Sequence, residues 1–367
     1  MNISPITSYN QSFKAATISI NALSDTHGEL KLANNAAEEM VERGNDIFCK
    51  EGRGKKNILA ICGDWYMDGS RTGYESAPNK PLMGFQTDIL NAFIGRISDF
   101  ASNLTTIFTP GNHEFDGGVQ LLDSSLQNIN ANTVVTNIDL DNSPGFSKTI
   151  NANKIFNEQI IEVEDDKNPE LKHKILILGV MPVNLAMYQK NLQGLSITEV
   201  NGKPQAQVEK KDYKKTLELC KKRIENFKKG NPKGIVVFLS HTGVNFADTL
   251  AKESCVDVIF DGHEHKNKIR IEGNTPIIPL SQNFMKIANV KININDNGDI
   301  SYLDINEFNP INNKTKGPVS KLYETLFQQD IKDKYYIESD NSQIKELDIK
   351  GVREGNNFLA NFVTDSV

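Results

Sequence analysis

The sequence predicts an α/β fold, because short apolar runs alternate along the chain with longer segments of helical periodicity. Apolar residues make up 38% and charged residues 24% of its 367 residues, a balance typical of a globular protein with a large core. Clusters of His and Asp directly follow several of the apolar runs. In open α/β sheets, that is the edge at which ligands bind.

Strands are predicted where apolar residues run together between polar or glycine-containing turns. The predicted strands are Thr17–Leu23, Asn57–Cys62, Thr105–Thr109, Thr133–Thr136, Lys174–Val180, Gly234–Leu239, Val256–Phe260, Pro276–Leu280, Val290–Ile294 and Ile300–Ile305. The last two flank Asn297 and Gly298, and an Asn-Gly turn between alternating strands predicts a hairpin.

Helices are predicted where apolar residues recur at intervals of three and four. The predicted helices are Lys31–Glu42, Met83–Phe100, Gln120–Asn128, Tyr213–Lys228 and Pro318–Lys334. Lys residues line the polar face of Tyr213–Lys228, which predicts a solvated surface helix. Two polar segments interrupt the alternation. Asp139–Asp166 is predicted to form loops or an irregular hairpin, and Asn184–Val208 is predicted to be an insertion.

Composition excludes several classes of protein. The formal net charge of −6 argues against binding a nucleic-acid polymer, which requires a strongly basic face. No apolar stretch is long enough to span a membrane. The first fifteen residues lack the apolar run of a signal peptide, so a cytoplasmic location is expected. The four cysteines, without CxxC spacing, are expected to be free thiols.

Five short motifs each follow a predicted strand, and together they carry the chemistry. The motifs are Ser24-Asp25-Thr26-His27-Gly28, Gly63-Asp64, Gly111-Asn112-His113-Glu114-Phe115-Asp116, Ser240-His241 and Gly262-His263-Glu264-His265. They contain five of the six histidines, and we interpret the sixth, His173, as incidental. Each motif alone is weak, but the ordered set predicts a metal site built from convergent ligands.

The residue types suit a pair of divalent cations. Asp25 and His27 lie two residues apart, as do His263 and His265, so on an extended segment both side chains of each pair point the same way. The Asp64 carboxylate could bridge two cations. Two metals about 3.5–4 Å apart would share and acidify a water, so that a bridging hydroxide attacks an ester in line. A mixed oxygen and nitrogen ligand set suits Mn, Zn, Fe or Co.

In their order along the chain, these motifs resemble those of the calcineurin-like metallophosphoesterases. The string Thr109–Asp116 resembles more narrowly the 5′-nucleotidase and 2′,3′-cyclic phosphodiesterase branch, as do the flanking Thr87–Phe93 and Val134–Asn137. The resemblance covers about residues 16–305. It implies a four-layer α/β/β/α sandwich, in which two mixed sheets are flanked by helices.

The resemblance also implies roles for individual residues. One metal would be held by Asp25, His27, Asp64 and His265, and the other by Asp64, Asn112, His241 and His263. His113 would act as general acid or stabilise developing charge, oriented by Asp116, although Asp116 could instead be a loop or helix cap. Glu114 and Glu264 are interpreted as solvated or supporting groups, and Trp65 could line the cleft or pack in the core.

The predicted domain organisation is an N-terminal tail (1–15), a catalytic domain (16–310) and a C-terminal helical tail (311–367). Within the tail, Arg353–Val367 resembles the opening of the second domain, which binds the nucleoside in this branch. Either the chain is a truncated product, or this segment docks on the catalytic domain as a helix. The substrate preference is therefore left open.

The expected function is metal-dependent hydrolysis of phosphate esters, nucleotides in particular. Two alternatives remain from the sequence: a 2′,3′-cyclic nucleotide phosphodiesterase, and a catalytically silent remnant that still binds metal. The expected partner is a small-molecule phosphate ester, with neither a nucleic-acid polymer nor a membrane. The sequence does not indicate an oligomeric state.

Overall fold

The computed structural model describes residues 14–310, apart from 29, 68–81, 184, 186–191, 199–212, 244 and 267. The predicted helix Pro318–Lys334, the predicted tail 311–367 and most of the insertion Asn184–Val208 lie outside the described residues.

Two mixed β-sheets form the centre of the described fold. The seven-stranded sheet has the order β13 (Ile300–Phe308), β12 (Ile287–Asn295), β1 (Lys14–Leu23), β2 (Lys55–Cys62), β3 (Leu104–Thr109), β4 (Asn132–Val134), β5 (Ile155–Phe156). The six-stranded sheet has the order β10 (Arg270–Glu272), β11 (Thr275–Pro279), β9 (Val258–Asp261), β8 (Ile235–Ser240), β7 (Lys172–Val180), β6 (Gln159–Glu164). Neighbours from β1 to β5 and from β7 through β8 and β9 to β11 run parallel, whereas β12, β13, β6 and β10 pair antiparallel.

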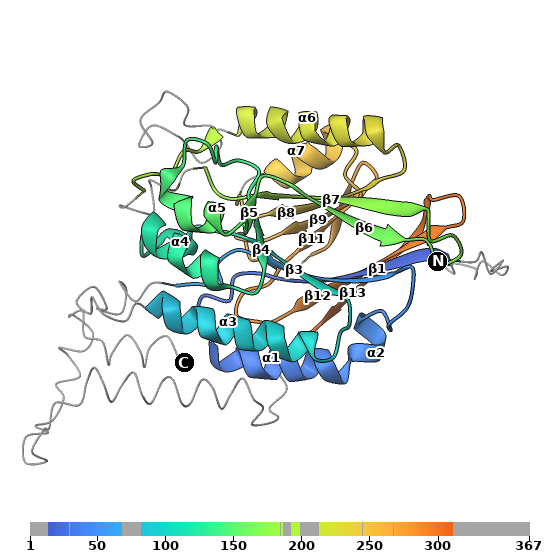
Figure 1. Ribbon diagram of the computed structural model, residues 1–367, viewed down its shortest axis with the longest axis horizontal. Coiled ribbons are helices and arrows are strands. Elements are labelled where there is room, and N and C mark those ends of the chain that lie inside the picture. The colour runs from blue at the N-terminus through green and yellow to red at the C-terminus, as the bar shows by residue number, and fades with distance from the viewer. Residues whose placement is uncertain are drawn as a thin grey trace, which may run out of the picture.

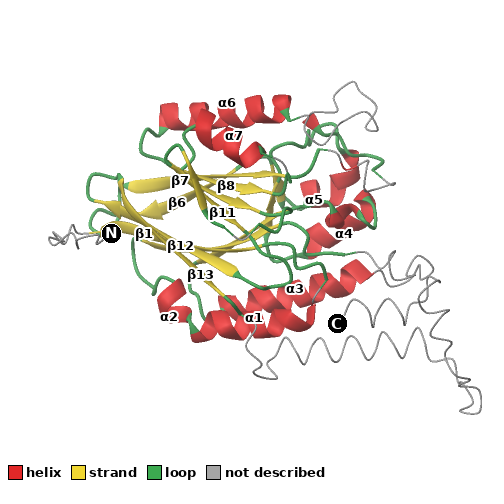
Figure 2. Cartoon of the chain, turned by 180° about the vertical axis from the view of Figure 1, so that it is seen from behind, coloured by secondary structure: helices red, strands yellow, loops and turns green. Residues whose placement is uncertain are grey.

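Helices cover the outer face of each sheet, which makes the four predicted layers (Figures 1 and 2). The helices are α1 (Leu30–Glu42), α2 (Gly44–Ile47), α3 (Leu82–Ser98), α4 (Val119–Asn128), α5 (Ser147–Asn151), α6 (Lys214–Gly230) and α7 (Phe246–Glu253). The first three lie below the seven-stranded sheet in Figure 1, and α6 and α7 lie above the six-stranded sheet. No helix of the described residues is long and apolar enough to cross a membrane.

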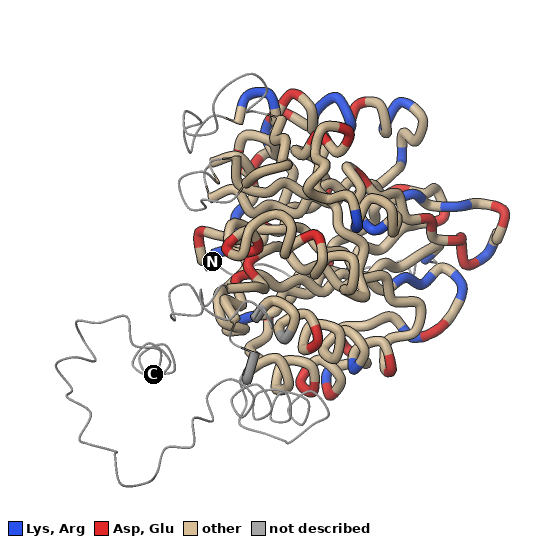
Figure 3. Tube along the Cα trace, turned by 60° about the vertical axis from the view of Figure 1, so that its left-hand side comes forward, with Lys and Arg blue, Asp and Glu red and all other residues tan. Residues whose placement is uncertain are grey.

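The core follows from strand periodicity, because alternate side chains of a strand point to opposite faces. Ile18 and Ile20 of β1 lie in one buried cluster with Ile175 and Ile177 of β7, between the two sheets. A second cluster fills the space between the sheets and the helices. In Figure 3 the charged residues gather on peripheral helices and loops, while the central strands carry few. The predicted amphipathic character of α6 is confirmed, since Cys220, Ile224 and Phe227 are its buried face.

The polar segment Asp139–Asp166 is more regular than predicted. It contains α5, β5 and β6, and β6 pairs antiparallel with β7 in a regular register. Ile161 and Val163 of β6 point into the core while their neighbours are exposed, so only half of the strand is apolar. His173, which was interpreted from the sequence as incidental, is buried, and its Nε2 lies 3.1 Å from Oδ2 of Asp165.

Candidate metal centre

The five motifs meet at one end of the two sheets. β1, β2 and β3 are parallel neighbours that end at Leu23, Cys62 and Thr109, directly before the first three motifs. In the other sheet, the parallel neighbours β8 and β9 lead into the remaining two. Parallel strands present their carboxyl ends at the same edge. The backbone of one motif then supports the next, as where the N–H groups of Asp25 and His27 donate to carbonyls of Gly63 and Asp64.

The site residues predicted from the sequence are linked by short distances. Three groups of side chains each present ligand atoms within 4.8 Å of one another: Asp25, His27 and His265; His27, Asp64 and His113; and Asp64, His241 and His263. Asn112 is buried in the same loop, directly before His113. Asp116 joins the cluster through His113. The structure thus brings the predicted Asp and His residues into one connected cluster, and Asn112 adjoins it through the chain.

Asp64 lies at the middle of this cluster. Its Oδ2 atom is 3.0 Å from Nε2 of His241 and 3.5 Å from Nε2 of His27, while its Oδ1 accepts a hydrogen bond from the backbone N–H of His113. Asp64 is almost completely buried, and burial opposes its ionisation. The neighbouring imidazoles, that of His241 first and then that of His27, outweigh burial and hold the pKa of Asp64 well below its usual range. The carboxylate is therefore ionised and faces imidazoles from both sheets.

His241 is arranged to offer Nε2 to a cation. Its Nδ1–H donates to the carbonyl oxygen of Cys62 at 2.6 Å, which fixes the ring. Its Nε2 is buried and makes no well-aligned hydrogen bond, although it faces Asp64. Burial would lower the pKa of His241, but the charges of Asp64 and Asp25 raise it to about 10. A divalent cation would satisfy the buried nitrogen and balance both carboxylates, so the residues present fit a metal.

Asp25 contacts the loop that carries His263 and His265. Its carboxylate accepts a hydrogen bond from the backbone N–H of His263 and lies 3.1 Å from Nε2 of His265. Burial opposes the ionisation of Asp25, but the charge of His241 and the hydrogen bond from His265 lower its pKa. Asp25 is thus an ionised oxygen donor beside the first predicted metal position.

The backbone of the motifs is strained where the ligands are presented. The left-handed region is unfavourable for residues with a Cβ atom, at of order 1–3 kcal/mol each. Non-glycine residues of the cluster with positive φ are Asp25 (54°), His27 (48°), Asp64 (54°), His263 (74°) and His265 (48°). Such strain persists only where the surroundings impose it, and it is concentrated here on candidate ligands.

Glycines allow the motifs to approach one another. A Cβ atom on Gly111 would lie 2.3 Å from Oδ1 of Asp64 and 2.6 Å from Nε2 of His241. At Gly63, which has a φ of 86°, it would lie 2.5 Å from Nδ1 of His241. A larger side chain at either position would displace the candidate ligands.

Glu114, which the sequence left as either a solvated or a supporting group, is a supporting group. Its side chain is completely buried, not solvated. It accepts hydrogen bonds from the backbone N–H groups of Asp64, Trp65, Tyr66 and Gly111, at 2.5–3.1 Å. Burial and the neighbouring charge of Asp64 raise the pKa of Glu114 to about 7, against these donors, which favour the ionised form. Glu114 therefore ties the loop after β2 to the loop after β3.

His113 is paired with Asp116, as the sequence predicts. Nδ1 of His113 lies 2.8 Å from Oδ2 of Asp116, which fixes the ring. Burial would lower the pKa of His113, but the hydrogen bond to Asp116 and the charge of Asp64 raise it. The alternative interpretation of Asp116 as a cap is compatible with its position, since it ends the 3₁₀ turn His113–Phe115. Its carboxylate nevertheless contacts the imidazole.

The remaining alternatives are settled by burial. Trp65 is completely buried and donates Nε1–H to the carbonyl of Gln86, so it packs in the core and does not line a cleft. Glu264 is exposed. All four cysteines are free, although Cys255, which follows α7, is exposed.

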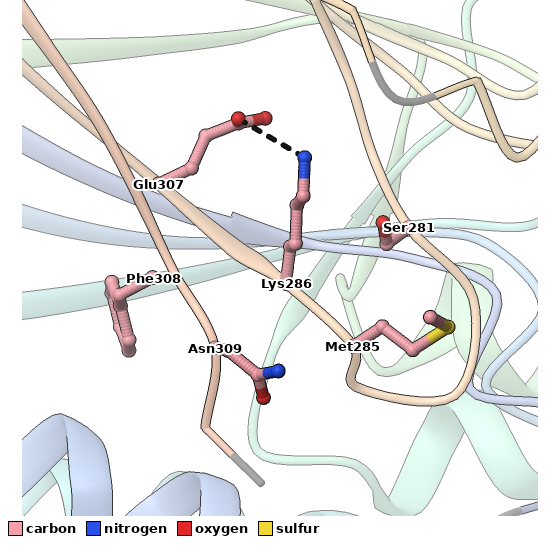
Figure 4. Close-up of a pocket in the computed structure, with 6 residues that line it drawn as sticks. All are labelled: Ser281, Met285, Lys286, Glu307, Phe308 and Asn309. Atoms are coloured by element: carbon pink, nitrogen blue, oxygen red, sulfur yellow. Dashed lines mark hydrogen bonds and ion pairs between the residues drawn. The ribbon is translucent and has the colours of Figure 1, made fainter.

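A separate cavity of about 450 Å³ lies beside the loop after β11 (Figure 4). It is lined by Ser281, Met285, Lys286, Glu307, Phe308 and Asn309, and the Lys286 ammonium and Glu307 carboxylate pair across it at 3.3 Å. The same loop reaches the cluster, because the backbone N–H of Asn283 donates to the carbonyl of Asp25. None of the candidate ligands lines this cavity, so the chemistry belongs to the Asp and His cluster.

A family model described as calcineurin-like phosphoesterase matches residues 18–267. This range contains all five motifs. A comparison with curated proteins finds no match.

Solved structures with the same fold include several phosphoesterases. The 5′-nucleotidase precursor of Thermus thermophilus is 14% identical, with a TM-score of 0.59 over 86% of this chain and 59% of that one. The calcineurin-like phosphoesterase YfkN of Bacillus subtilis is 16% identical, with a TM-score of 0.60 over 87% of this chain and 98% of that one. The NAD nucleotidase of Haemophilus influenzae is 15% identical, with a TM-score of 0.53 over 86% and 56% of the two chains. This chain spans under three-fifths of the length of both nucleotidases. At these identities the likeness shows the fold.

Proposed function

This chain belongs to the calcineurin-like phosphoesterase family, and from this premise we propose that it hydrolyses small phosphate esters, nucleotides among them, at a centre of two divalent cations. Asp64 would be a ligand of both cations. Asp25, His27 and His265 would complete the first site, and Asn112, His241 and His263 would complete the second.

The position of Asp64 is the observation that carries the proposal. Nε2 of His27 lies 3.5 Å from its carboxylate and Nε2 of His241 lies 3.0 Å from the same oxygen, and each histidine belongs to a different ligand group. A carboxylate between two such groups can serve both. Bound there, two divalent cations would supply an activated water and charge neutralisation for an in-line displacement at phosphorus.

The side chains around the ester have separate roles. His113 belongs to the same group as His27 and Asp64, and its ring is 5.4 Å from that of His27, centroid to centroid. Because Asp116 occupies Nδ1, the protonated ring of His113 presents Nε2–H to the substrate. We assign to this proton the neutralisation of the leaving oxygen. Glu114 holds the backbone of Asp64, so that the carboxylate stays oriented while the ester reacts.

Nucleotides are proposed as substrates because two of the structural neighbours are named nucleotidases. A 2′,3′-cyclic nucleotide remains the alternative substrate, since the same centre can attack a diester.

We expect the chelated protein to regain hydrolysis only when Mn²⁺, Zn²⁺, Co²⁺ or Mg²⁺ is returned. The measurement is the steady-state rate on p-nitrophenyl phosphate, AMP, a 2′,3′-cyclic nucleotide and bis-p-nitrophenyl phosphate. Faster turnover of AMP than of the cyclic nucleotide supports a nucleotidase, and the reverse supports the phosphodiesterase.

Two outcomes would overturn the proposal. Hydrolysis that survives chelation would exclude a metal centre as its cause. Metal binding without turnover of any ester in the panel would instead identify a protein that binds cations and is catalytically silent.

A further inference from the structure

Two candidate ligands, His263 and His265, lie on one loop that leaves β9 at Asp261 and enters β10 at Arg270. The ends of this loop are not adjacent in the sheet. β11 lies between them, pairing in parallel with β9 and antiparallel with β10. The two strands are therefore about 10 Å apart, twice the usual spacing, and no backbone ladder joins them.

A side chain joins the two ends instead. Nη2 of Arg270 donates to Oδ2 of Asp261 at 3.0 Å, across β11. The same guanidinium forms a forked pair with Asp248 of α7, Nε to Oδ1 at 2.6 Å and Nη2 to Oδ2 at 3.1 Å. Arg270, the first residue of β10, thus contacts both Asp261, the last residue of β9, and Asp248 in the first turn of α7.

Asp261, the buried partner of Arg270, lies next to candidate ligands of the cluster. The side chain of Asp261 is 6% exposed, and Asp261 is the partner, in the parallel register of β9 and β8, of Ser240, the residue before His241. Gly262 follows, where a Cβ atom would lie 2.3 Å from Oγ of Ser24 and 3.0 Å from Nδ1 of His241. A shift of Asp261 would therefore be transmitted to candidate ligands on both β8 and β9.

We propose that Arg270 is a positioning residue for the metal centre. Its guanidinium holds together the two ends of the loop that carries His263 and His265, by binding Asp261 at the start of the loop and Asp248 of α7. The inference rests on the proposed function, since it presupposes that this loop carries metal ligands. The planar fork of arginine is needed here, because lysine would keep the charge but could not bind both carboxylates in the same geometry.

The test measures the affinity of the chelated protein for Zn²⁺ alone, by competition with a chromogenic chelator. We expect R270M to bind Zn²⁺ about 10–100-fold more weakly than the wild type, the range seen when a residue supporting metal ligands is removed. The conservative variant R270K is expected to fall between them. If R270M does not fold, D248N, which weakens the forked pair, provides the same comparison.

Arg96 offers a matched control far from the cluster. It forms an equivalent forked pair with Glu38, which joins α3 to α1 at 2.8 Å for both contacts. Its side chain is 26% exposed and that of Arg270 is 23% exposed. R96M should lose a comparable amount of thermal stability yet keep the Zn²⁺ affinity of the wild type. Unchanged affinity in R270M, or equal loss in R270M and R96M, would overturn the inference. Failure of the wild type itself to bind Zn²⁺ would refute the proposed function.

Discussion

Replacement of Asp64 by alanine is expected to lower the turnover of a phosphate ester on the order of 10⁴-fold, the scale of losing one member of a catalytic unit. Asp64 is the only carboxylate shared by two of the three candidate ligand groups among the described residues. Without it, the imidazoles of His27 and His241 share only the more distant Asp25 carboxylate, at 3.9 and 3.8 Å, and the proposed bridging ligand of the two cations is lost. The measurements are the rate constant kcat and the number of metal ions bound per chain, which should fall below two.

Loss of the fold must be separated from loss of the centre. D64N keeps the shape of the side chain and an oxygen that can accept the N–H of His113, and it should show most of the loss. Asp165 provides the control: it is a buried aspartate paired with a histidine, His173, near the start of β7 and away from the motifs. D165A should lose stability while retaining kcat per folded molecule and two metals. Full activity in D64A would contradict the assignment.

Replacement of His113 by asparagine is expected to lower kcat by about 10²–10⁴-fold, the usual contribution of a general acid. Metal content should stay unchanged, because His113 is assigned to the substrate and not to a cation. H173N, which alters the buried histidine outside the cluster, is the control. An H113N variant that loses metal and activity together would show that His113 is a ligand.

The role of Asp116 is tested through the pH profile of the same reaction. Asp116 helps to raise the pKa of His113, so D116N should lower that pKa. A general acid must be protonated, and activity therefore falls as pH rises through its pKa. The alkaline limb of kcat should move to lower pH in D116N. Movement of the acidic limb alone would instead indicate that His113 acts as a base.

Local signals in the sequence were sufficient for the α/β class and for expecting the motifs at one edge of the sheets, whereas the four layers were implied by the family resemblance. Each motif follows a run such as Asn57–Cys62 or Val256–Phe260, and parallel strands place their carboxyl ends together whatever their order. The fold class and the family resemblance are confirmed. The assignment of individual ligands stays a prediction, which the distances around Asp64 support.

Other features depend on contacts between residues that are distant in the sequence. β6 was not predicted because only Ile161 and Val163 mark its inward face within a polar segment. Glu114 is adjacent to His113 in sequence, but its four donors come from two loops. The contact of Arg270 with Asp261 spans β11, which follows both of their strands in the sequence but lies between them in the sheet.

In the proposed centre, the carboxylate of Asp64, which follows a strand of the seven-stranded sheet, would organise two cations together with histidines from both sheets. Anomalous diffraction from crystals of the Mn²⁺-loaded protein tests it most directly. We expect two anomalous peaks per chain, both in coordination contact with the Asp64 carboxylate, one beside His27 and the other beside His241. A single peak, or peaks that do not contact Asp64, would contradict it.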